Sequence, residues 1–403
     1  MEVYVARQPI FRRNRKIYAY ELLFRGGMVN AFPDIDGDTA TSKVLSNTFL
    51  TMGMEHVLGG KRAFINFTRD LLVQKVPMMF PREQVTVEVL EDVSPEPEVV
   101  DACREIGEKG YEIALDDFLY RDELRPLIQL AKIIKIDFMA ISLEDIAEYV
   151  EKLAPYDVKF LAEKVETHEG FQRALDMGFT YFQGYFFSKP QILTGRDVSS
   201  SKINLMQMVA EANKEDMKFE ELEKIVTRDV SITYKLLRYM NSAYFRRMQE
   251  ITSIKQAMVL LGQNGVRRFI SLITMAKLAS DKPDELLRTS IIRARMCEWL
   301  GKETPSGVDT SELFILGLFS LIDAILDQEM DKLMDKLPLS DAVKNTLVKS
   351  EGQLSVFLNL VKAYEAGDWE SFSDSVSKTG VNEEKVPGYY LDAVGWADSM
   401  STI

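Results

Sequence analysis

Residues 112–137, EIALDDFLYRDELRPLIQLAKIIKID, decide the fold of the first half of the chain. Two short apolar runs, Glu112–Leu115 and Ile133–Ile136, have strand character, and both are followed or interrupted by charged residues. Runs of this kind recur along the first half with single helical segments between them. Parallel strands need such a crossover, so the pattern predicts βαβ units and a parallel sheet.

The alternation extends from the N-terminal region to about residue 185. The other predicted strands are Tyr18–Phe24, Ala63–Phe67, Val85–Leu90, Lys159–Ala162 and Tyr181–Tyr185. Helical patterns between strands include Ala40–Met52, Glu98–Lys109 and Gly170–Met177. This many units favours a closed (β/α) barrel over an open sheet.

The second half has a different periodicity. From Lys202 onward apolar residues recur every three or four positions, which predicts helices throughout. Residues 197–201, DVSSS, have the composition of a linker. We therefore predict an α/β barrel domain at residues 1–197 and an all-α domain at residues 198–403.

Composition narrows the function classes. The 403 residues carry 49 Lys and Arg against 62 Asp and Glu, a net charge of −13, which disfavours generic binding to nucleic acid. The two cysteines lie far apart, and no signal peptide or membrane span is visible, so we expect a cytoplasmic protein. Both histidines, His56 and His168, lie in the first half, so the second half has no histidine for a metal centre or a general base.

Polar residues that suit one kind of chemistry lie at or near the ends of the predicted strands. They are Glu21, Asn66, Glu88, Asp116, Asp117, Lys135, Glu163, Glu166 and Gln183. In a parallel barrel all strand carboxyl ends face one side, so these side chains are expected to converge. Carboxylate and amide oxygens prefer Mg²⁺, Mn²⁺ or Ca²⁺, and two such ions bridged by Asp116 or Asp117 would activate water against a phosphodiester. A lone strand-end carboxylate such as Asp137 is instead expected to be a cap.

Short motifs in this half form an ordered series. They are Gln8-Pro9-Ile10, Glu21-Leu22-Leu23 with Arg25, Ile65-Asn66-Phe67, Glu88-Val89-Leu90-Glu91, Leu115-Asp116-Asp117-Phe118, Lys135-Ile136-Asp137, Ala162-Glu163-Lys164-Val165-Glu166-Thr167 and Gln183-Gly184-Tyr185. The series resembles, over nearly all of residues 1–195, the EAL domain family of cyclic di-GMP phosphodiesterases, which have a modified (β/α)8 barrel.

The resemblance implies a role for each matching position. The implied ligands of a two-metal site for Mg²⁺ or Mn²⁺ are Glu21, Asn66, Glu88, Asp116 and Asp117. Lys135 would order the attacking water and Glu163 would be a ligand or general base, so Glu21, Lys135 and Glu163 are the implied catalytic residues. The implied ligand-binding residues are Gln8, Leu23, Arg25, Glu166 and Gln183, with Arg25 pairing a phosphate and Gln183 also completing the metal site.

One loop departs from the family pattern. After Phe118 the family continues with a Gly-Thr-Gly stretch that orders the second metal and helps to form a dimer, whereas this chain has Leu119–Arg125 without glycine. Glycine adopts backbone conformations that Leu119 and Arg121 do not readily adopt. The altered loop, together with the change of EAL to Glu21-Leu22-Leu23, implies weak, conditional or absent turnover. Whether the protein forms a homodimer through the barrel is left undecided by the sequence.

The second half resembles HDOD domains, relatives of HD phosphohydrolases that lack the metal site. The matching stretches are residues 229–243, DVSITYKLLRYMNSA, and residues 254–262, IKQAMVLLG, and Ser320-Leu321 stands where a hydrolase has His-Asp. The whole chain thus resembles bacterial EAL–HDOD signalling proteins, sometimes called the YuxH type. Arg267-Arg268, with Arg246-Arg247 and Lys235, is either a basic interaction face or a solvated helix face, and solvation is favoured.

Two function classes remain. The first is Mg²⁺- or Mn²⁺-dependent hydrolysis of cyclic di-GMP. The second is a catalytically silent signalling module, whose barrel binds the nucleotide or a protein and whose HDOD half binds an unidentified signalling protein. The altered loop favours a regulatory protein with low phosphodiesterase activity.

Overall fold

The computed structural model describes residues 5–24, 58–189, 200–213, 217–241, 251–304, 307–335, 337 and 339–401. The chain divides into two compact units. Unit 1 contains Met1–Phe187 together with Tyr364–Trp369, and unit 2 contains Ser188–Ala363 and Glu370–Ile403. The predicted boundary between residues 197 and 198 and the predicted helix Ala40–Met52 lie outside the described residues.

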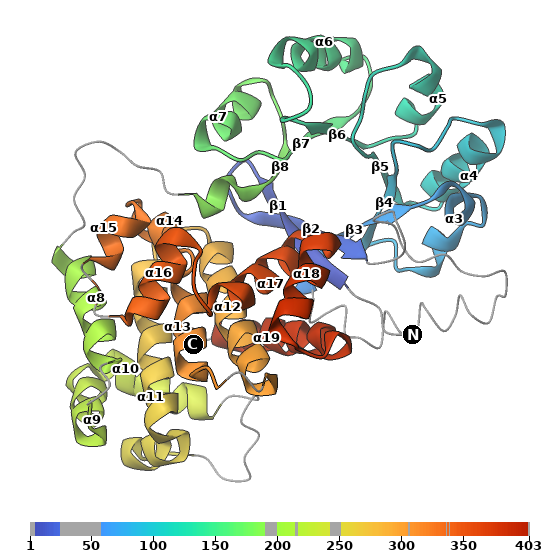
Figure 1. Cartoon of the computed structure of the whole chain (residues 1–403). Coiled ribbons are helices and arrows are strands. Elements are labelled where there is room, and N and C mark those ends of the chain that lie inside the picture. Colours follow the sequence, from blue (N-terminus) through green and yellow to red (C-terminus); the bar gives the residue numbers. More distant parts are fainter. Residues whose placement is uncertain are drawn as a thin grey trace. The chain divides into compact units, whose positions relative to one another are not determined.

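Unit 1 is built on a closed barrel of eight strands in sequence order (Figure 1). The strands are β1 (Val5–Arg12), β2 (Ile17–Phe24), β3 (Arg62–Phe67), β4 (Val85–Val89), β5 (Glu112–Leu115), β6 (Ile133–Asp137), β7 (Lys159–Glu163) and β8 (Tyr181–Gln183). Strand β1 runs antiparallel to both of its neighbours, β2 and β8, and the other pairs are parallel. The predicted barrel is confirmed, with β1 as an additional strand.

Short helices connect the parallel strands, and Figure 1 shows them outside the ring of strands. They are α3 (Arg69–Val73), α4 (Pro97–Glu108), α5 (Arg125–Ile128), α6 (Leu143–Leu153) and α7 (His168–Asp176), with 3-10 turns η1 (Val76–Met79), η2 (Asp122–Leu124) and η3 (Tyr185–Ser188). Ser142 and Thr167 cap α6 and α7, since their hydroxyl oxygens accept the N–H groups of Asp145 and Gly170.

Unit 2 is helical, and its described part contains no strand. Its helices are α8 (Ser200–Ala212), α9 (Phe219–Arg228), α10 (Val230–Met240), α11 (Ile254–Leu278), α12 (Asp284–Glu303), α13 (Thr310–Phe319), α14 (Ile322–Leu326), α15 (Met330–Met334), α16 (Asp341–Lys349), α17 (Ser355–Ala366), α18 (Trp369–Thr379) and α19 (Val386–Ser401), with a 3-10 turn η4 (Glu383–Lys385). The last residues of α17 and the first of α18 belong to unit 1. The all-α prediction is confirmed, and none of the described helices has the length and apolar character of a membrane span.

Candidate active site

Alternation along the strands places a polar layer directly above an apolar plug inside the barrel. The plug consists of Ile10, Ala19, Phe64, Ala114, Ile133, Leu161 and Tyr181. Two residues nearer the carboxyl ends of β2, β3, β5, β6, β7 and β8, the chain has Glu21, Asn66, Asp116, Lys135, Glu163 and Gln183. Inward positions recur every second residue, so these side chains form the next layer. Gln8 is two residues before Ile10 because β1 runs the opposite way.

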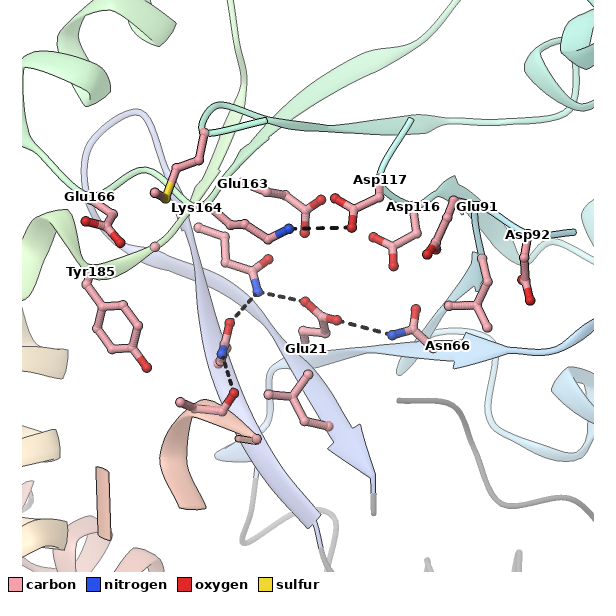
Figure 2. Close-up of a pocket in the computed structure, with 18 residues that line it drawn as sticks. Glu21, Asn66, Glu91, Asp92, Asp116, Asp117, Glu163, Lys164, Glu166 and Tyr185 are labelled. Carbon is pink, nitrogen blue, oxygen red and sulfur yellow. Dashed lines mark hydrogen bonds and ion pairs between the residues drawn. The ribbon is translucent and has the colours of Figure 1, made fainter. Parts of the chain in front are cut away.

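A cavity of about 560 Å³ opens above this layer (Figure 2). The predicted site residues in its wall are Gln8, Glu21, Leu23, Asn66, Asp116, Asp117, Glu163, Glu166 and Gln183. Glu88 and Lys135 do not line the cavity and are completely buried. Arg25 lies outside the described residues.

Lys135 is the centre of a buried ionic cluster. Its Nζ lies 2.6 Å from Asp116 Oδ1, 2.7 Å from Glu88 Oε1 and 3.0 Å from Glu163 Oε1. Glu21 Oε2 is 3.4 Å away on the remaining side. One ammonium therefore faces four carboxylates, and the cluster has an excess of negative charge.

The pKa values in this cluster follow from burial and charge. Burial raises the pKa of Glu88 and that of Glu163 well above the usual range, although Lys135 opposes the shift. Burial lowers the pKa of Lys135, but the surrounding carboxylates outweigh it and hold that pKa well above its usual value. The cluster thus keeps its ammonium and stabilises further positive charge, whether a proton or a cation.

A chain of hydrogen bonds holds Glu21 in place. Gln183 Nε2 donates to Glu21 Oε2 at 2.7 Å and to Gln8 Oε1 at 2.9 Å. Asn66 Nδ2 donates to Glu21 Oε1 at 3.3 Å, and Figure 2 shows this bond as a dashed line between the two side chains. Both oxygens of Glu21 are therefore oriented by neutral amides.

Four oxygen atoms around the cavity are buried and accept no hydrogen bond within the described part of the chain. They are Asn66 Oδ1, Asp117 Oδ1, Glu163 Oε2 and Gln183 Oε1. Buried polar atoms normally have partners, so this group marks a place for a ligand. Hard oxygen donors of this type fit Mg²⁺ or Mn²⁺. Among the described residues no three His, Cys, Asp or Glu side chains already surround a common metal position.

Asp137 was expected to cap a helix, but the N-cap of α6 is Ser142, and Asp137 holds the preceding turn instead. Its Oδ1 accepts the backbone N–H groups of Met139 and Ala140 at 2.6 and 3.0 Å, which stabilises the turn before α6. Its Oδ2 pairs with Lys164 Nζ at 2.5 Å, and the same ammonium lies 3.5 Å from Asp117 Oδ2. Burial opposes the shift, but these contacts lower the pKa of Asp137.

Several residues of the cavity wall were not predicted as site residues. Glu91, Lys164 and Tyr185 lie inside motifs that the sequence displays, and their polar character was the available signal. Asp92 follows Glu91 directly. Ala366 and Gly367 also line the cavity, and no local pattern marks them.

The glycine-free loop Leu119–Arg125 forms a 3-10 turn and enters α5. The Leu119 side chain is 54% exposed, and Arg125 pairs with Asp122 at 2.8 Å. None of these residues lines the cavity. The loop in this chain is thus a surface feature beside the site.

Comparison with known proteins finds two domain families in the chain. The EAL domain family matches residues 59–190, and the HDOD domain family matches residues 201–346. A protein of Vibrio cholerae serotype O1 named cyclic di-GMP phosphodiesterase CdgJ is 38% identical over 99% of this chain and 93% of its own length. The uncharacterized protein YuxH of Bacillus subtilis is 36% identical over 99% of both chains.

Solved structures give a weaker likeness. An EAL domain protein from Listeria monocytogenes has a TM-score of 0.35 and 21% identity, and the match covers 46% of this chain and 87% of that chain. This similarity is too low to bear on function.

Proposed function

Because the chain belongs to the family of proteins that join an EAL domain to an HDOD domain, we propose that it is a cyclic di-GMP signalling protein with low phosphodiesterase activity. Its barrel would bind cyclic di-GMP with Mg²⁺ or Mn²⁺ and hydrolyse it slowly to a linear dinucleotide. The observation that carries the proposal is the set of unpartnered buried oxygens beside a carboxylate cluster at the cavity. The volume of the cavity, about 560 Å³, lies within the range of about 300–1,000 Å³ that is usual for ligand sites.

The proposed chemistry assigns a task to each group. Glu21, Asn66, Asp116, Asp117 and Gln183 would hold divalent cations, with Glu88 below them. Bound cations would lower the pKa of water and offset phosphate charge.

The remaining groups act on the water and the nucleotide. Glu163, which lines the cavity, would take the proton of the attacking water. Lys135 would keep the carboxylates together from beneath the cavity and would act on that water only through Asp116 and Glu163. Gln8, Leu23 and Glu166 would contact the dinucleotide from the cavity wall.

The loop Leu119–Arg125 supports slow turnover. In the family that this sequence resembles, a glycine-containing loop at this place orders the second metal. Here the backbone forms a 3-10 turn and lines no part of the cavity. A site with its ligands but without this loop would bind nucleotide better than it would hydrolyse it.

The test is metal-dependent turnover by the full chain. We expect hydrolysis of cyclic di-GMP in Mn²⁺ above a metal-only control, and a loss on the order of 100-fold in Glu21→Gln. The matched control is Glu112→Gln, since Glu112 begins β5 at the other end of the barrel and pairs with Arg62. That variant should keep its rate within about twofold, because surface ion pairs contribute little.

Calorimetry in Ca²⁺ separates binding from turnover. Absence of both turnover and nucleotide binding would overturn the proposed function. Binding without turnover would instead favour the second candidate, a catalytically silent signalling module that presents the nucleotide-bound state to a partner protein of the helical unit. The altered loop is the observation that favours this candidate.

A further inference from the structure

A short segment from the far end of the chain belongs to the barrel unit. This segment, Tyr364–Trp369, is called the strap here. Tyr364 is completely buried, and its hydroxyl donates to the Val5 carbonyl oxygen at 3.1 Å. The Tyr364 and Trp369 rings pack edge to face with centroids 5.5 Å apart. The strap is thus anchored on the first strand of the barrel.

The middle of the strap forms part of the cavity wall. The Ala366 carbonyl oxygen accepts a hydrogen bond from Gln8 Nε2 at 3.2 Å. Gly367 has φ +67°, and a Cβ there would lie 2.7 Å from Leu23 Cδ1 and 3.1 Å from Leu23 Cβ. The strap therefore touches Gln8 in β1 and Leu23 in β2. Within the described part of these strands, they are the residues assigned to the nucleotide.

The Ala366 carbonyl determines how two side-chain amides are oriented. A carbonyl only accepts, so Gln8 must turn its NH₂ group toward Ala366 and its oxygen toward Gln183. Gln183 must then turn its NH₂ group toward Gln8 and Glu21, which agrees with the carboxylate being an acceptor. The remaining atom, Gln183 Oε1, is buried and accepts no hydrogen bond within the described residues.

We propose that the strap is a positioning element of the nucleotide and metal pocket. Through Ala366 it fixes the amides of Gln8 and Gln183 so that Gln183 presents its oxygen to the bound ligand, and Gly367 allows the strap to lie against Leu23. Neither the EAL match at residues 59–190 nor the HDOD match at residues 201–346 includes the strap. The proposal rests on the proposed function, because the ligand is the metal-bound nucleotide.

The test displaces the strap with a substitution at a residue that is not itself assigned to the nucleotide or the metal. In the full chain, Gly367→Val places a branched side chain against Leu23 at a left-handed position. The matched control is Gly380→Val, which has φ +71° and no atom within 4 Å of the added Cβ. Calorimetry with cyclic di-GMP over a range of Ca²⁺ concentrations gives both the dissociation constant and the metal requirement.

We expect Gly367→Val to weaken nucleotide binding about tenfold or more and to raise the metal concentration needed, since a mispositioned supporting residue costs about 10–100-fold. Gly380→Val should stay within about twofold of the wild type. A merely structural role of Gly367 would lower the melting temperature and leave the metal requirement unchanged, so that result overturns the inference. If the wild type itself does not bind the nucleotide, the proposed function is overturned, and the inference about the strap is overturned with it.

A second variant keeps the inference testable if Gly367→Val does not fold. Tyr364→Phe removes the hydroxyl that anchors the strap to Val5, and Tyr364 does not line the cavity. We expect faster hydrogen exchange in peptides that cover residues 364–369 and weaker nucleotide binding. Faster exchange with unchanged nucleotide affinity would overturn the positioning role.

Discussion

Lys135 determines the charge balance of the site. Its ammonium is completely buried and contacts four carboxylates, two of which have raised pKa values. The sequence indicated that Lys135 belongs to the site, because it interrupts the predicted strand Ile133–Ile136, whose other residues are apolar. The sequence did not reveal that Lys135 and Glu88 lie beneath the cavity, since depth depends on strand stagger and side-chain length.

Removal of this ammonium should make the fold dependent on a divalent cation. Lys135→Met keeps an unbranched side chain and leaves the four carboxylates around Nζ without their cation, so we expect the free energy of unfolding to fall by about 3–5 kcal/mol without metal. Mn²⁺ should restore more stability to this variant than to the wild type. Urea titrations with and without Mn²⁺ measure both quantities.

Lys164→Met is the matched control. The Lys164 side chain is 52% exposed, so loss of its ion pairs should cost about 1 kcal/mol or less. Equal stabilisation of wild type and Lys135→Met by Mn²⁺ would contradict the role of Lys135 in charge balance.

At the scale of elements, the end of β8 depends on one glycine. Gly184 has φ +137°, and a Cβ there would lie 2.3 Å from the Val165 carbonyl oxygen and 2.5 Å from its nitrogen. Val165 is hydrogen-bonded to residues on both sides of Gly184, from Val165 N to Gln183 O and from Phe186 N to Val165 O, each 3.0 Å long. Backbone atoms cannot move aside as a side chain can, so this contact is specific for glycine.

Gly184→Ala should therefore destabilise the barrel by about 3 kcal/mol or more, as the sum of left-handed strain and overpacking. Gly178→Ala is the control, since Gly178 has φ +91° and nothing within 4 Å of the added Cβ. That control should lose only about 1–2 kcal/mol. If thermal unfolding shows that the two variants lose the same free energy of unfolding, the close approach to Val165 has no energetic effect.

The sequence predicted the parallel strands but not β1. The residues of β1 explain why this strand was missed. The strand reads VARQPIFR, in which Arg7, Gln8 and Pro9 interrupt the apolar alternation. It also lacks the helical crossover that identifies the others, because it pairs antiparallel with both neighbours. The strap was not predictable, since Gln8 and Ala366 are 358 positions apart and only tertiary packing brings them together.

At the scale of the whole molecule, the division into two units predicts two unfolding transitions in calorimetry. Cyclic di-GMP with Ca²⁺ at about 100 times its dissociation constant should stabilise unit 1 by about 2.7 kcal/mol, which corresponds to a shift of about 5–10 °C. The transition of unit 2 should shift less, because of its helices only α17 and α18 carry residues of the strap. Nucleotide without a divalent cation is the control and should shift neither transition. A shift of both transitions together would contradict independent unfolding.

The strap also affects when the pocket can form during synthesis. The 176 residues between Phe187 and Tyr364 are translated after the last part of the barrel and before the strap. At about 5–20 residues per second, a ribosome needs roughly 9–35 s for them. A nascent chain therefore completes its strands well before it completes the wall beside Gln8 and Leu23. Release of the chain before residue 364 would yield a barrel without this wall, so the proposed recognition of the nucleotide depends on translation through the strap.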